Sequence, residues 1–75
     1  MVNWTEVLAN RKQLRTVAKF AGGDMSASQL RSSFKGTDAS REVNSLIKTH
    51  GTTYARRLAR KALKRRGTVV TAPQD

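Results

Sequence analysis

Apolar residues recur at intervals of three and four along most of the chain, the pattern of amphipathic helices packed on a common core. Capping residues and glycines divide this pattern into segments. The expected helices run from a cap at Asn3 to about Ala21, from a cap at Ser26 to Lys35-Gly36, from a cap at Thr37 or Asp38 to Gly51, and from Thr52 to Gly67.

The short connections between these segments predict an all-α fold, a compact bundle of about four short helices. The chain has 75 residues, enough for one small domain, which we place at residues 1–67. Residues 68–75 are expected to form a short flexible C-terminal tail. Within the tail, Thr68–Thr71 is β-prone without an obvious partner strand, and residues 72–75 have the composition of a frayed end.

The first helix is expected to start with a capping box, in which Asn3 caps and Glu6 reaches back to it. Phe20 falls outside the main apolar arc of this helix, so it is predicted to pack against the next turn of chain instead. The core face of the first helix is predicted to comprise Val7, Leu14, Val17, Ala18 and Ala21.

The two middle helices show narrower apolar edges. Ser26 and Gln29 have the spacing of a second capping box. His50 is expected on the apolar side of the third helix, near its C-terminal end. The predicted core residues of these helices are Leu30 and Phe34 in the second, and Ala39, Val43, Leu46 and Ile47 in the third.

The last helix separates its apolar and basic residues most clearly. Seven of the eleven residues from Arg56 to Arg66 are Arg or Lys, and none is acidic. At about 100° per residue, one arc is apolar and the opposite arc is basic. The apolar arc holds Ala55, Leu58, Ala59, Ala62 and Leu63; the basic arc holds Arg56, Arg57, Arg60, Lys61, Lys64 and Arg65.

The net charge of the whole chain also indicates a role for its basic residues. Fifteen basic and five acidic residues give a net charge of +10. Self-repulsion of this size favours a polyanionic partner, with nucleic acid first. Arginine outnumbers lysine in the last helix, which favours forked hydrogen bonds to phosphates or guanine edges. We expect duplex DNA ahead of structured RNA. A second basic stripe, on the first helix, consists of Arg11, Lys12, Arg15 and Lys19.

Residues 26–50 have the components of a DNA-binding helix-turn-helix: a short helix, a turn around Gly36 and a longer helix. The tightest form of the motif does not fit, because polar Glu42 and Ser45 would occupy apolar positions. A looser turn would fit, and a plain helical hairpin is the alternative. In the helix-turn-helix interpretation, the third helix offers Ser40, Arg41, Asn44, Ser45 and Lys48 to the groove.

Catalytic chemistry has little support in the sequence. The single histidine, His50, lacks a cysteine or a nearby acidic partner, and a helix-end role explains it. The carboxylates show no metal-ligand spacing, so we expect no catalytic residue, metal, cofactor or small-molecule substrate. The absence of cysteine is compatible with a reducing cytoplasm. No segment approaches the apolar length of a membrane span.

The expected function is nucleic-acid binding, in a phage or plasmid regulator, an architectural factor or a genome binder inside a virion. Two other classes remain open. One is an adaptor whose basic face meets an acidic protein, and the other is a membrane-active, bacteriocin-like cationic helix protein. A homodimer is also compatible with the sequence, through exposed helix faces or the β-prone tail.

Overall fold

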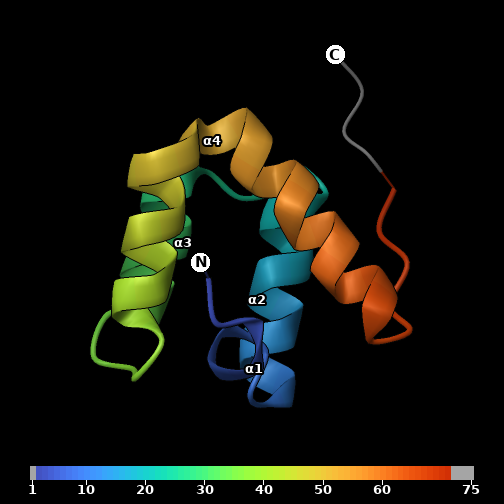
Figure 1. Ribbon diagram of the computed structural model, residues 1–75, viewed down its shortest axis with the longest axis horizontal. Helices are drawn as coiled ribbons and strands as arrows, with labels where there is room; N and C mark the ends of the chain where they lie inside the picture. Colours follow the sequence, from blue (N-terminus) through green and yellow to red (C-terminus); the bar gives the residue numbers. More distant parts are fainter. Residues whose placement is uncertain (1, 72–75) are drawn as a thin grey trace.

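Four α-helices form the regular structure of residues 2–71, the part of the chain that the computed structural model describes (Figure 1). No strand occurs in that range. The fold is therefore all-α, as the sequence predicts. The predicted frayed end, residues 72–75, lies outside the described residues. The helices are α1 (Trp4–Val7), α2 (Arg11–Ala21), α3 (Ala27–Phe34) and α4 (Ser40–Arg65).

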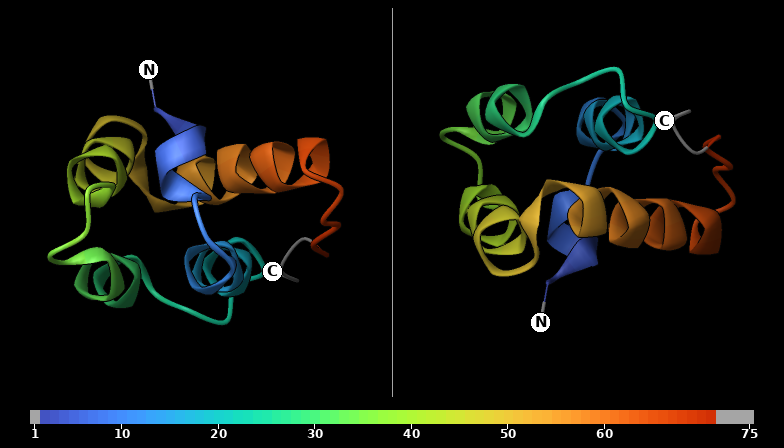
Figure 2. Two further views of the ribbon diagram at one scale, coloured as in Figure 1. Left: turned by 90° about the horizontal axis from the view of Figure 1, so that it is seen from below. Right: turned by 90° about the horizontal axis from the view of Figure 1, so that it is seen from above.

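The helices pack in two layers around one core (Figure 2). α2 and α3 lie side by side in one layer. The long α4 forms the other layer, and α1 packs against both α2 and α4. The predicted core faces account for most of the buried side chains. The core comprises Val7, Leu8, Val17, Phe20, Ala21, Leu30, Phe34, Ala39, Val43, Leu46, Ala55, Ala59, Ala62 and Leu63.

The single helix predicted from residue 4 to 21 is wrong, because the chain breaks at Leu8–Asn10. Asn10 caps α2 by accepting a hydrogen bond from the Gln13 backbone nitrogen at 2.8 Å. The Gln13 side chain in turn donates to the Glu6 carbonyl oxygen at 2.8 Å. One Asn–Gln pair thus starts α2 and satisfies an end of α1, which stabilises two helices in place of one.

Phe20 corrects a second expectation. Its exposed fraction is 0%, so it belongs to the core and not outside the apolar arc. Both α3 and α4 pack on α2. A helix with two neighbours buries a wider arc than a single stripe, and Phe20 fills the added width.

α4 contains both the third and the fourth predicted helices, joined by a kink at Gly51 (Figure 1). Gly51 has φ 79° and ψ 169°, a backbone conformation that essentially only glycine adopts. The predictions that a helix closes at Gly51 and that the next helix follows at once are therefore both correct. We call residues 40–50 the first arm of α4 and residues 52–65 the second arm.

Several helix ends differ from the prediction. Asn3 caps α1 as predicted, but its backbone nitrogen donates to the Glu42 carboxylate at 3.0 Å and not to Glu6. Neither Thr37 nor Asp38 caps α4, which has Ala39 at its N-cap without a side-chain hydrogen bond. The Thr37 hydroxyl instead donates to the Phe34 carbonyl oxygen, where it stabilises the end of α3. The Ser26–Gln29 capping box of α3 is confirmed.

His50 is exposed, contrary to its predicted place on the apolar side. The centre of the His50 ring lies 5.1 Å from that of Tyr54, a residue of the second arm, so the ring contact spans the kink.

The chain leaves α4 at Gly67 in a left-handed conformation, with φ 83°. The Thr68 nitrogen donates to the Leu63 carbonyl oxygen at 2.9 Å, as in a Schellman motif. The segment then returns toward α2, where Val70 packs beside Gly22 at the edge of the core. Val69 is 85% exposed. At least Val70 therefore anchors the predicted flexible tail to the domain.

Candidate nucleic-acid interface

The second arm of α4 presents its cations because its apolar arc is buried. Ala55, Ala59 and Leu63 are all 0% exposed, and Ala62 is 5% exposed. Leu58, the fifth member of the predicted arc, is half-buried. The arc faces the core, where α2 lies, so the opposite side of the helix faces solvent. The sequence pattern therefore predicts the orientation of this helix correctly.

Two of the six arginines and lysines predicted on the basic arc are held by the protein itself. The Arg56 guanidinium donates to the Phe20 and Met25 carbonyl oxygens at 3.0 and 3.1 Å. Arg60 donates to the Ala21 carbonyl oxygen at 2.9 Å. These carbonyls lie at or just beyond the C-terminal end of α2, where cations interact favourably with the negative end of the helix dipole. Arg56 and Arg60 thus join α4 to α2.

The other four predicted cations are exposed, and three of them lie along the outer side of the second arm. Arg57, Lys61 and Lys64 are spaced four and three residues apart, so they form one line along the helix. We call them the basic strip. At about 1.5 Å per residue, the strip is about 10 Å long. Arg65 is also exposed, on the flank. Together with Arg60, Val69 and Val70, the strip lines a shallow hollow that contains no acidic residue.

The predicted stripe on α2 does not join this strip. All four of its cations are exposed. However, α2 and the second arm of α4 occupy different layers (Figure 2), and none of the four α2 cations lines the hollow that the strip lines. Lys12 moreover lines a separate hollow toward α3, with Thr16 and Ser33. The fold therefore presents two basic surfaces, not one. The α2 surface comprises Arg11, Lys12, Arg15 and Lys19.

α3 and the first arm of α4 run side by side in opposite directions, connected at Lys35–Ala39 (Figures 1 and 2). This is the plain helical hairpin, whereas the helices of a helix-turn-helix cross at about 90–120°. Arg41 and Lys48 are exposed on the first arm. Asn44 instead accepts a hydrogen bond from Arg31 Nε at 3.2 Å. Of the five residues predicted to face a groove, Ser40 is half-buried and the other four are exposed, so a recognition face on this arm stays a prediction.

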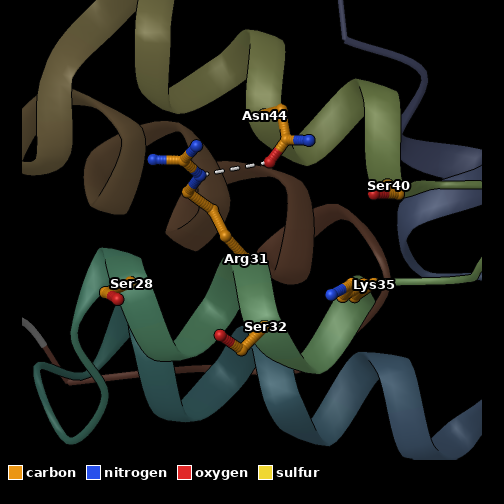
Figure 3. Close-up of a pocket in the computed structure, with 6 residues that line it drawn as sticks. All are labelled: Ser28, Arg31, Ser32, Lys35, Ser40 and Asn44. Carbon is orange, nitrogen blue, oxygen red and sulfur yellow. Dashed lines mark hydrogen bonds between the residues drawn. The ribbon is translucent and has the colours of Figure 1, made fainter.

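A further polar hollow lies between α3 and the first arm of α4 (Figure 3). Its position was not predicted from the sequence, although Ser28, Arg31 and Ser32 have the spacing of one helical face. That signal was readable, but serines at such positions are usually no more than solvated surface. The lining residues are Ser28, Arg31, Ser32, Lys35, Ser40 and Asn44.

In residues 2–71, no group of three or more His, Cys, Asp or Glu side chains is close enough to hold a metal ion. None of the helices in this range is both long and apolar enough to cross a membrane. Comparisons of the chain with protein-family models, curated proteins and solved structures found no significant match.

Proposed function

We propose that this protein binds nucleic acid through the basic strip of α4, with duplex DNA preferred over structured RNA. The observation that carries the proposal is the arrangement of Arg57, Lys61 and Lys64. All three are exposed on one side of a helix whose other side is anchored in the core. No acidic residue occurs between positions 52 and 67 to neutralise them.

The strip is suited to phosphates more than to base edges. Duplex DNA carries one charge per about 1.7 Å of its axis, so a strip about 10 Å long can reach several phosphates. With Arg56 and Arg60 bonded to α2, two of the three strip residues are lysines, which act as point charges without a forked geometry. Phosphate contacts position a protein without reading sequence. The proposal therefore favours an architectural or genome-packaging role, in the cytoplasm or inside a virion, over a sequence-specific regulator.

The membrane-active alternative is less well supported. A helix that inserts into a bilayer surface needs a free apolar face. The apolar arc of the second arm is buried against the rest of the domain, and insertion would require the fold to open. An acidic protein surface remains the second candidate partner, because it could meet the same three cations.

Titration of a short duplex at several salt concentrations tests the proposal. The wild-type log–log salt slope should include about −2 to −3 from the strip, at about 0.9 per phosphate. Replacing Arg57, Lys61 and Lys64 together by Gln should remove that part of the slope and leave thermal unfolding unchanged. A structured RNA in parallel gives the DNA preference. A wild-type protein that binds neither polymer at 50 mM salt would refute the proposal.

A further inference from the structure

The hollow between α3 and the first arm of α4 is lined by hydrogen-bond donors from both helices (Figure 3). Positions 28, 31 and 32 share one face of α3, position 35 follows at its C-cap, and positions 40 and 44 share the facing side of α4. The lining consists of three serines, one asparagine, one arginine and one lysine, without a carboxylate. Such a surface complements an oxyanion.

The arginine in this hollow is oriented by its neighbour across the gap. Arg31 Nε donates to Asn44 Oδ1 at 3.2 Å. This bond uses one edge nitrogen of the guanidinium and leaves both terminal nitrogens as donors. Asn44 keeps its own amide nitrogen as a further donor. A forked donor held in this way loses less conformational freedom when it binds an anion.

The two cations of the hollow also favour an anion between them. Arg31 lies in the last turn of α3 and Lys35 caps its C-terminal end, so two like charges that repel each other stand at one end of the helix. Both side chains line the same hollow. A bound anion would reverse this repulsion into two attractions.

We propose that this hollow binds a single phosphate group, the anion that a nucleic-acid backbone presents. This inference rests on the proposed function and deepens it, since it adds a phosphate contact outside the basic strip. The guanidinium of Arg31 and the ammonium of Lys35 neutralise the phosphate charge. The hydroxyls of Ser28, Ser32 and Ser40 supply neutral hydrogen bonds.

The test compares Arg31→Gln and Lys35→Gln with Arg66→Gln, which removes an equal charge at an exposed position outside the hollow. With a short duplex, each hollow variant should weaken binding about tenfold and flatten the salt slope by up to about one unit. Ser32→Ala should weaken binding severalfold with little change in slope, because it removes a hydrogen bond and no charge. Equal effects of Arg31→Gln and Arg66→Gln would overturn the inference while leaving the proposed function intact.

A second experiment uses inorganic phosphate and the free protein, so that it does not depend on nucleic-acid binding. Phosphate titration followed by NMR should shift the Arg31 Nε–H and Ser32 amide signals first, with a response that saturates and disappears in Arg31→Gln. Chloride at equal ionic strength should not reproduce it. This response without duplex binding would support the phosphate hollow and refute the proposed function. Shifts spread evenly over all basic residues would overturn the hollow.

Discussion

Arg56 contacts Phe20 in two ways, since its Nε donates to the Phe20 carbonyl oxygen at 3.0 Å and its guanidinium carbon lies 5.0 Å from the centre of the Phe20 ring. The contact spans 36 residues of sequence. It joins the end of α2 to the start of the second arm of α4, at a ring that is fully buried. An arginine that local pattern assigns to the solvent-facing arc is therefore part of the framework that orients the basic strip.

The first prediction concerns this arginine. Arg56→Gln should lower the free energy of unfolding by about 1–3 kcal/mol, because charged hydrogen bonds to the Phe20 and Met25 carbonyls are lost. For a domain this small, each kcal/mol corresponds to about 4–8 °C in Tm. Arg57→Gln is the matched control, since it removes the same charge from an exposed neighbour. Equal melting temperatures for the two variants would show that Arg56 has no structural role.

The second prediction separates two leucines that the sequence places on the same arc. Leu63 is 0% exposed, whereas Leu58 is only half-buried. Leu63→Ala should cost about 2–5 kcal/mol through lost contacts and a cavity. Leu58→Ala should cost about 1–1.5 kcal/mol, in proportion to its smaller buried area. Urea denaturation measures both. Equal costs would mean that the second arm is rotated relative to the packing described.

The sequence predicted the helical class, most of the core and the orientation of the second arm, because each follows from local periodicity. The sequence could not show that Arg56 and Arg60 bond to the protein itself whereas Arg57 is exposed. All three share one basic arc, and only contact with the distant end of α2 distinguishes them. The break before α2 was different. Asn10 and Gln13 carry a readable capping signal, but apolar periodicity continues through it and suggests one helix.

The third prediction addresses the kink at Gly51. A Cβ atom at this position would meet nothing within 4 Å, so substitution there is limited by backbone conformation and not by space. Gly51→Ala should cost about 1–3 kcal/mol, since φ 79° with ψ 169° is strained for an L-residue. Total chemical synthesis allows D-alanine at position 51 as the control. Its mirror-image preference fits this conformation, so the wild-type melting temperature should be kept or exceeded.

Thermal melts of the L-alanine and D-alanine proteins show whether the kink at position 51 is a fixed feature of the fold. If the L-alanine protein melts like wild type and gains helical circular dichroism, the two arms of α4 can straighten into one helix. The kink would then not be a fixed feature of the fold. Equal losses for both enantiomers would point to a contact of the methyl group that the open space around Gly51 does not predict.

The last prediction uses the division of the cations between two layers. The basic strip and the α2 surface lie on helices of different layers, so one short, straight duplex should contact mainly one of them. If the strip is the contact surface, replacing Arg57, Lys61 and Lys64 together by Gln should flatten the salt slope by two or three units, at about 0.9 per phosphate. Replacing Arg11, Arg15 and Lys19 together by Gln removes the same charge from α2. This variant should change the salt slope by less than one unit.

The equal charge change makes the comparison independent of the long-range field of the protein, because both triple variants lower the net charge by the same amount. All six side chains are exposed, so both variants should keep the wild-type melting temperature. A larger flattening of the salt slope by the α2 variant would show that the α2 surface, and not the basic strip, contacts the duplex. Equal flattening by both would require a duplex that bends around the protein, or two duplexes bridged by one molecule. Measuring the stoichiometry with a 12-base-pair and a 40-base-pair duplex separates these cases, since bridging joins two short duplexes whereas bending needs one long duplex.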